Sequence, residues 1–194
     1  MGNHLKNILT GATIMIAVLW AVELLDWLLF WWNLDSFGIR PRQLKGLPGI
    51  ILSPLLHAGV WHLLSNTIPL FILTVVLFMF YDRIGVQTLL VIVVVGGGLV
   101  WLLGRSAYHV GASGVIYGIA AFLVASGFFR RDFKSIVIAA VVVLVYGGLF
   151  WGLFPTQFRI SWEAHLFGAL AGVFAAYIFR NAELNPQTAT EMDE

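Results

Sequence analysis

Six long apolar stretches constrain this chain more than any other feature of its sequence. Each comes close to the roughly 20 consecutive apolar residues that a helix needs to cross the hydrocarbon core of a bilayer. They cover residues 8–30, 61–80, 86–103, 113–129, 136–154 and 162–179. Because 60% of the residues are hydrophobic and only 11% are charged, a water-soluble domain is excluded. Lipid is therefore the solvent for most of the chain.

The apolar stretches predict helices. They are continuous and lack the alternation of polar and apolar residues that marks the strands of a transmembrane barrel. In lipid every backbone polar group needs an internal partner, which a continuous segment finds as a helix. We predict an all-α membrane protein in which residues 1–180 form one domain, a bundle of six transmembrane helices. The polar tail at 181–194 has no apolar periodicity and is predicted to be disordered.

The first apolar stretch and the long connection after it both fit this bundle. The stretch carries Glu23 and Asp26 and ends in aromatic residues, so it is predicted to be a helix and not a cleaved signal peptide. Between residues 31 and 60, proline and glycine interrupt apolar and basic residues. We expect this segment to form an interfacial loop that lies partly among lipid headgroups.

The charges of the chain are few and nearly balanced. A formal net charge of +1 offers no basis for binding nucleic acid, and the absence of cysteine excludes disulfides and thiolate chemistry. The cluster of Arg130, Arg131 and Lys134 between the fourth and fifth stretches is the clearest signal of orientation. It favours cytoplasmic termini, because basic residues concentrate in cytoplasmic connections.

Polar side chains inside the predicted spans are candidate functional residues, because they are costly in hydrocarbon. His62 and Asn66 are four residues apart and so lie on one helix face, and His57 precedes His62 by five residues. Interhelical hydrogen bonding is the alternative explanation for such residues. Three of them together favour a site.

A hydroxyl and an imidazole stand near the starts of two later spans. Ser113 begins the fourth apolar stretch, and His165 lies near the start of the sixth. A serine becomes a nucleophile when a neighbouring base accepts its proton, which a histidine can do at neutral pH. Glu163 lies on a different helix face from His165, so we predict a Ser-His dyad without a carboxylate. His62, Asn66 and the Ser113 amide are the predicted donors to the oxyanion that the attack creates.

Small residues are predicted to bring the serine and the histidine together. Gly114 and Gly118 form one stripe of small residues, and Gly168 and Gly172 form another. Such stripes let helix backbones approach closely in lipid, and ordinary helix packing is the alternative explanation for either stripe alone. Tyr117, one turn after the serine, is a candidate for packing against the imidazole.

The ordered set of these motifs resembles the rhomboid family of intramembrane serine proteases. The resemblance covers roughly residues 52–180 and points to the minimal six-helix bacterial form. The residues that carry it are His57, His62 and Asn66, then Gly111, Ala112, Ser113 and Gly114 with Tyr117, and finally Ala164, His165, Gly168 and Gly172.

What the resemblance implies is proteolysis in the membrane. Ser113 would be the nucleophile and His165 the base, and the substrate would be a transmembrane helix of another protein, cut near the membrane surface. No cofactor or metal is expected, and the expected location is the plasma (inner) membrane of a prokaryote. The other implied roles are oxyanion or substrate contacts from His62, Asn66, Gly111 and Ala112, a structural role for His57, and support from Tyr117, Gly114, Gly118, Gly168 and Gly172.

The resemblance also bears on substrate entry and on the first loop. In rhomboids the fifth helix and the loop after it form a mobile gate, which here would comprise Phe150, Trp151, Phe154 and the loop 155–161. An aromatic belt that anchors the helix at the interface is the alternative. Many rhomboids carry a Trp-Arg pair in the long first loop. No such pair occurs here, which leaves the placement of that loop open.

Other classes of membrane protein fit the sequence less well. A zinc protease needs His-Glu-x-x-His, but the segment from His57 to His62 has neither that spacing nor the glutamate. Asp82 lacks the second aspartate, in a Gly-x-Gly-Asp context, that aspartyl intramembrane proteases require, and Val115 breaks the soluble hydrolase elbow Gly-x-Ser-x-Gly. Two alternatives stay open: a rhomboid-like protein that escorts transmembrane helices without cutting them, and a transporter with a proton relay. The relay would use His57, His62, His109 and His165.

Overall fold

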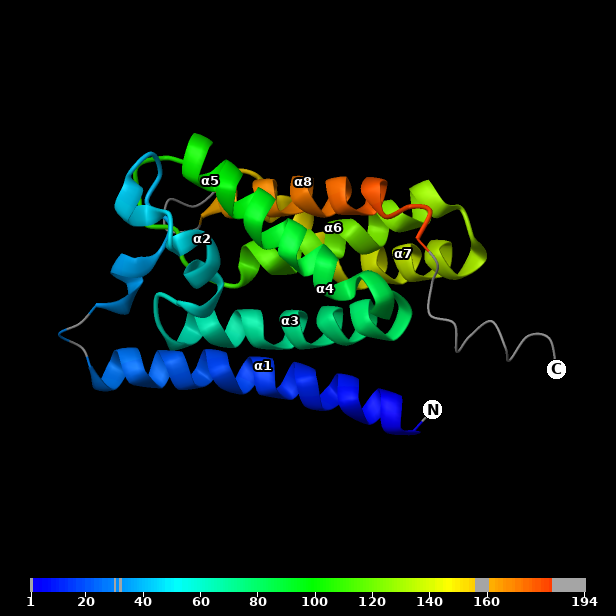
Figure 1. Ribbon diagram of the computed structural model, residues 1–194, viewed down its shortest axis with the longest axis horizontal. Helices are drawn as coiled ribbons and strands as arrows, with labels where there is room; N and C mark the ends of the chain where they lie inside the picture. Colours follow the sequence, from blue (N-terminus) through cyan, green and yellow to red (C-terminus); the bar gives the residue numbers. More distant parts are fainter. Residues whose placement is uncertain (1, 30, 32, 156–160, 183–194) are drawn as a thin grey trace.

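Helices account for all the regular structure in the described part of the chain. The computed structural model describes residues 2–29, 31, 33–155 and 161–182 (Figure 1). Five helical stretches there are long and apolar enough to cross a membrane: Gly2–Leu28, Val60–Phe80, Asp82–Leu103, Ser113–Arg130 and Phe133–Leu153. A shorter apolar helix, Trp162–Ile178, has 17 residues, which is the lower limit for a span. The all-α membrane bundle predicted from the sequence is confirmed; of the predicted tail at 181–194, residues 183–194 lie outside the described residues.

The first, third and fifth spans start three or more residues earlier than predicted, and the fifth begins at residue 133 and not at residue 136. Helix α1 (Gly2–Leu28) begins six residues before the predicted span at residue 8, because a helix can continue past the hydrocarbon into the polar headgroups. The third span begins at Asp82 and not at residue 86, with an acidic residue in the first turn, where the helix dipole favours it. It comprises α4 (Asp82–Val91), a π-helical turn η4 (Ile92–Gly96) and α5 (Gly97–Leu103).

The fifth span changes its helix type before it ends. Helix α7 (Phe133–Tyr146) is capped by the preceding residue, Asp132, whose side chain accepts a hydrogen bond from the Ser135 amide. It is followed by a 3-10 segment, η5 (Gly147–Leu153), and not by the continuous α-helix to residue 154 that the hydropathy predicted. The change falls at Gly147 and Gly148, because glycine is a poor former of α-helix.

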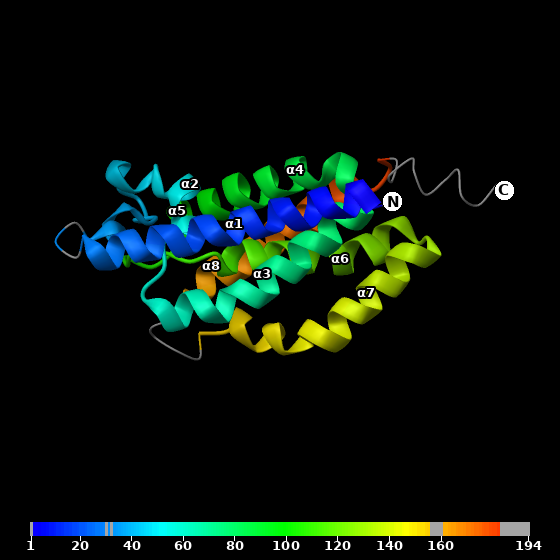
Figure 2. The ribbon, with the colours of Figure 1, turned by 90° about the horizontal axis from the view of Figure 1, so that it is seen from below.

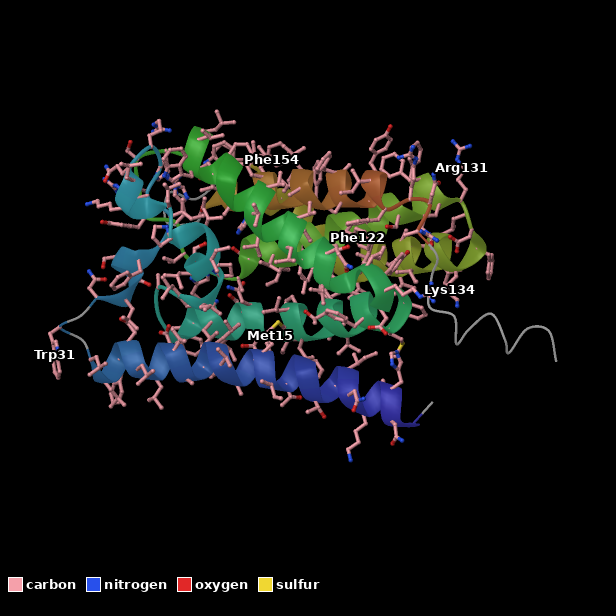
Figure 3. The ribbon with its side chains drawn as sticks, in the orientation of Figure 1. Met15, Trp31, Phe122, Arg131, Lys134 and Phe154 are labelled. Carbon is pink, nitrogen blue, oxygen red and sulfur yellow. The ribbon has the colours of Figure 1, made fainter. Side chains whose placement is uncertain are left out.

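Helix α6 (Ser113–Arg130) lies at the centre of the bundle. It contributes Ile119, Phe122 and Leu123 to the fully buried core and packs most extensively against α8 (Trp162–Ile178). Helix α1 forms one edge of the bundle beside α3 (Val60–Phe80), and α7 lies at another edge (Figures 1 and 2). Phe122 points into the bundle interior, whereas Arg131 and Lys134 stand at the end where α1 begins (Figure 3).

A polar network fastens α7 at this end. The Tyr81 hydroxyl, 1% exposed, lies 3.1 Å from Ser135 Oγ, which in turn donates to Asp132 Oδ2. Arg130 lies 3.5 Å from the Asp132 carboxylate and also donates to the carbonyl of Phe179, just past the end of α8. The first turn of α7 is therefore bonded to α3, α6 and the C-terminal end of α8.

The long first loop is folded back onto the bundle by arginine. It contains four short helical segments: η1 (Leu34–Phe37), η2 (Leu44–Gly46), α2 (Gly49–Leu52) and η3 (Ser53–Leu55). The Arg42 guanidinium donates to the carbonyls of Leu102 and Gly104, which would otherwise lack partners at the end of α5. Arg40 lies over the Tyr108 ring, and Ile39 pairs with His109 through backbone hydrogen bonds. Without a Trp-Arg pair, the loop is placed by contacts with residues 101–109.

Candidate active site

Ser113 and His165 come together at the starts of two neighbouring helices. Ser113 is the first residue of α6 and His165 stands in the first turn of α8. The distance from Ser113 Oγ to His165 Nε2 is 2.9 Å, and the two residues are only 8% and 7% exposed. Both side chains are therefore buried in the bundle.

The glycine stripes face each other across the contact between α6 and α8. A Cβ atom at Gly168 would strike the carbonyl oxygen of Gly114, and one at Gly172 would strike that of Gly118. Gly96, in the π-helical turn, is also close enough that its Cβ would lie 3.3 Å from the Gly168 Cα. Only glycine allows these backbones to approach so closely, and this approach sets the distance between the serine and the histidine.

Two contacts hold the His165 ring. The Tyr117 ring stacks on it, with centroids 4.1 Å apart and planes 5° from parallel. The Gly152 carbonyl, in η5, lies 2.9 Å from His165 Nδ1. The sequence pointed to the tyrosine but not to the glycine, because a backbone carbonyl leaves no mark on residue type.

Glu163 takes no part in the Ser-His pair. It is 3% exposed, and its Oε1 lies 3.6 Å from the Arg105 guanidinium and within reach of the Arg105 amide. A second bond joins the same two segments: His109 Nδ1 lies 2.6 Å from Ser161 Oγ, and its Nε2 lies 3.1 Å from the Arg105 carbonyl. Burial lowers the pKa of His109, so the ring is neutral. These contacts fasten the loop before Ser113 to the start of α8.

His62 and Asn66 border the turn that precedes Ser113. Gly111 has a φ of 114°, a conformation that glycine adopts readily, and a Cβ there would lie 2.6 Å from His62 Cε1 and 3.7 Å from Asn66 Nδ2. Asn66 is 5% exposed, and its side-chain amide has no hydrogen-bond partner among the described residues. A buried N–H donor without a partner is costly, so this one is available for an oxyanion.

The backbone amides of Gly111 and Ala112 are already engaged. The Gly111 amide donates to the Ser53 carbonyl at 2.9 Å, and the Ala112 amide donates to His57 Nε2 at 3.3 Å. Neither N–H group is therefore free for a second acceptor in this structure, and contacts of Gly111 and Ala112 with an oxyanion or a substrate stay a prediction. The Ser113 amide differs from them, because the first N–H groups of a helix have no partner within it.

His57 is a buried hydrogen-bond acceptor for the turn that precedes Ser113. It is 2% exposed, and burial together with the neighbouring His62 lowers its pKa to about 4. A neutral ring keeps a lone pair on Nε2 for the Ala112 amide. The structural role that the resemblance implied thus has a concrete form, a bond that holds the turn before Ser113.

Stability should depend on the ionisation of His57 below neutral pH. The unfolded chain takes up a proton near pH 6.5 and the folded chain only near pH 4, so stability falls as the pH is lowered from 6.5 to 4, by up to about 3 kcal/mol. Asp35, whose pKa burial and Asp26 raise to about 6, has the opposite effect in this range. We therefore compare the parent with His57→Gln, which keeps an acceptor but does not titrate. Thermal unfolding in detergent should depend less on pH in the variant, and equal pH dependence would contradict this account.

The aromatic residues of the predicted gate face outward. Phe150, Trp151 and Phe154 are 55%, 71% and 45% exposed and contact one another, with ring centroids 5.3 to 6.5 Å apart. Their rings therefore do not pack inward against the site. The inward contacts of this segment are made by the Gly152 backbone and by Leu149, which packs against the core. Of the predicted gate loop, residues 156–160 lie outside the described residues.

A metal site does not emerge from the described residues. No three His, Asp or Glu side chains among residues 2–29, 31, 33–155 and 161–182 lie close enough together to hold an ion. Two histidines of the alternative relay touch each other, because the ring centroids of His57 and His62 lie 5.2 Å apart. The other two have separate partners: His109 contacts Ser161 and Arg105, and His165 contacts Ser113 and Gly152.

The fold and the site define an integral membrane protein with a buried serine and histidine at the starts of two helices that cross in contact. Comparison with known sequences then shows which family this is. The family model of the rhomboid domain matches residues 45–182. The chain therefore belongs to the rhomboid family, as its motifs predicted.

Relatives of the chain occur in mycobacteria. Uncharacterized proteins of Mycobacterium bovis and Mycobacterium tuberculosis are 41% identical to it over 139 residues, which is 68% of this chain and 58% of each relative. An uncharacterized protein of Mycobacterium leprae is 36% identical over 136 residues, or 66% of this chain and 54% of the relative. The match thus spans somewhat more than half the length of these relatives.

Proposed function

We propose that this chain is a serine endopeptidase that hydrolyses peptide bonds in or near the transmembrane helices of other membrane proteins. The observation that carries the proposal is the 2.9 Å contact between Ser113 Oγ and His165 Nε2 inside a rhomboid bundle. Ser113 attacks the carbonyl carbon of the scissile bond while His165 accepts its proton. The imidazolium then protonates the leaving amine. In the second half of the reaction water attacks the acyl-enzyme while His165 accepts its proton, and the imidazolium returns a proton to Ser113 as the acid product leaves.

Hydrogen-bond donors for the oxyanion that would form on the substrate lie on one side of Ser113. The Asn66 side chain, the half-buried His62 ring and the Ser113 amide at the helix start all border the Gly111 turn. Donors that are fixed in a low-dielectric site stabilise such an oxyanion without first having to reorient. Burial of the whole group inside the bundle favours a substrate that arrives from lipid.

Labelling with a fluorescent fluorophosphonate tests this proposal. The probe reacts with an activated serine and needs no helical substrate to enter the site. We expect labelling of the parent chain in detergent, loss of labelling in Ser113→Ala, and normal labelling in Ser126→Ala, which removes another buried serine of α6. A parent chain that is folded but unlabelled, and that binds transmembrane peptides, would support the escort function in place of catalysis.

Asn66→Ala should reduce turnover strongly and substrate binding little. Loss of one oxyanion donor costs about 2.7 to 4 kcal/mol of transition-state stabilisation, which is about 100-fold or more in rate. Initial rates on a reporter transmembrane substrate, measured over a range of substrate concentrations in liposomes, separate kcat from KM. Ser65→Ala, on the exposed face of the same helix, is the control. A raised KM with unchanged kcat would assign Asn66 to substrate docking.

Orientation and location belong to the same proposal. The basic residues of the turn between α6 and α7 stand at the end of the bundle where α1 begins (Figure 3). We propose that this end faces the cytoplasm of a prokaryote, with the protein in the plasma membrane. Ser113 then lies toward the opposite face.

A further inference from the structure

We propose that the Gly152 carbonyl positions the catalytic base, so that the outer end of the fifth span must be packed against α8 for Ser113 to be activated. This inference rests on the proposed function, since it assigns the control of the same serine. The segment η5 would then have two roles, because it would have to move for a substrate to enter and it also holds the imidazole.

The hydrogen bond determines which nitrogen of His165 carries the proton. A carbonyl oxygen can only accept, so the 2.9 Å contact with Gly152 requires a proton on Nδ1. Nε2 of the neutral ring is then the bare nitrogen, and it faces Ser113 Oγ. The opposite tautomer would place a proton against the serine and could not accept another. Gly152 therefore fixes the tautomer and the orientation of the ring, which is one of the two roles of the aspartate in a Ser-His-Asp triad; it lacks the negative charge that stabilises the imidazolium.

Among the residues that the structure describes, no other contact of His165 can make this selection. The Tyr117 ring lies parallel to the imidazole. A rotation of the imidazole by half a turn about its χ2 bond exchanges the two edges of the ring but leaves this stacking contact unchanged. Glu163, the nearest carboxylate along the chain, is engaged with Arg105. A directional acceptor is needed to distinguish Nδ1 from Nε2, and Gly152 supplies it.

Position 152 has room for glycine alone. A Cβ there would collide with the Tyr117 hydroxyl and would lie 3.3 Å from His165 Nδ1. The glycines at 147 and 148 differ, because a Cβ at either would meet nothing within 4 Å. Of the three glycines in η5, Gly152 touches the site and Gly147 and Gly148 do not. A substitution at Gly148 is therefore a matched control for the same substitution at Gly152.

Apart from this bond, η5 is held by half-buried side chains, of which Leu149 packs against the core. The buried residues of α7 are Ser135, Ile138 and Val142, all in its first three turns, and no residue of η5 is buried. Among the described residues, the bond to His165 is the one side-chain hydrogen bond that joins η5 to another helix. An outward displacement of η5 would therefore break the Gly152 bond and withdraw Leu149 from the core, while the polar network at Tyr81 and Asp132 holds the opposite end of α7.

Gly152→Ala and Gly148→Ala, made in the full chain, test the proposal. The readouts are the rate of fluorophosphonate labelling at Ser113, which requires no opening for a helix, and the rate of cleavage of a transmembrane substrate. We expect Gly152→Ala to slow labelling about tenfold, the effect of one lost hydrogen bond, and Gly148→Ala to label at the parental rate. If Gly152→Ala labels as fast as the parent while cleavage rises, η5 is only a barrier and the proposal is wrong.

A Tyr117→Phe background separates loss of the bond from general misfolding. The phenyl ring keeps its stacking on His165 but removes the hydroxyl that the new Cβ would strike. Gly152→Ala should therefore slow labelling much less in this background than in the parent, which a cycle of the four proteins measures. An equal loss in both backgrounds would overturn the proposed role of this contact.

The tautomer of His165 can be observed directly in the parent chain. In a sample labelled with 15N-histidine at neutral pH, the His165 signals, assigned by their loss in His165→Gln, should show a protonated Nδ1 and a bare Nε2. The opposite tautomer would overturn the proposal even if Gly152→Ala does not fold. A parent chain with the expected tautomer that the fluorophosphonate does not label would instead refute the proposed function.

Discussion

Ser113→Ala and His165→Ala should each abolish cleavage of a reporter transmembrane substrate while the protein stays folded. In the proposed mechanism Ser113 supplies the attacking oxygen, and a serine hydroxyl is a weak nucleophile unless a base such as the imidazole 2.9 Å away accepts its proton. Because the two residues act as a unit, the double variant should be about as inactive as either single one. Cleavage is measured in liposomes, and folding by thermal unfolding in detergent.

The two single variants also test each residue separately. Substantial cleavage by His165→Ala would remove the histidine from the role of base, and substantial cleavage by Ser113→Ala would show that another group attacks. Ser126→Ala is the matched control for the serine, because it removes a hydroxyl from the same helix at a position that is 2% exposed. Activity lost in that control as well would indicate that cavities in α6 disable the protein, and not the loss of a nucleophile.

Gly168→Leu and Gly172→Leu should lower both the unfolding temperature and the activity. A side chain at either position would enter the carbonyl of Gly114 or Gly118, and a backbone carbonyl in a helix cannot move aside as the end of a flexible side chain can. Overpacking of a tight interface typically costs about 1–3 kcal/mol, and here it would also separate Ser113 from His165.

Gly98→Leu is the control for these variants. A Cβ at Gly98 meets nothing within 4 Å, so the same substitution there adds bulk to an apolar helix without wedging two helices apart. The unfolding temperature and the initial cleavage rate should be lower in Gly168→Leu and Gly172→Leu than in Gly98→Leu. Unchanged stability in Gly168→Leu would mean that α6 and α8 do not touch at this position in the membrane.

The first loop was predicted from the sequence, but its contacts with the bundle were not. Proline, glycine and arginine between residues 31 and 60 indicated a loop at the interface, and the missing Trp-Arg pair left its placement open. The structure places it through Arg42, which donates to the carbonyls at the end of α5. An arginine in a loop has many possible acceptors, and only the folded chain brings one set of them within reach.

Residue type and spacing by themselves determined the membrane bundle, the approximate position of each helix and the pairing of Ser113 with His165. These properties follow from local quantities: the apolar length of a segment, the 3.6-residue period that places His62 and Asn66 on one face, and the glycines that allow close approach. Only the tertiary structure decided that the amides of Gly111 and Ala112 are engaged, that the aromatics of η5 face outward, and that Gly152 bonds the base. The physical reason is that these contacts are made by backbone atoms, which every residue carries alike, so their partners depend on where the chain folds and not on which residue stands there.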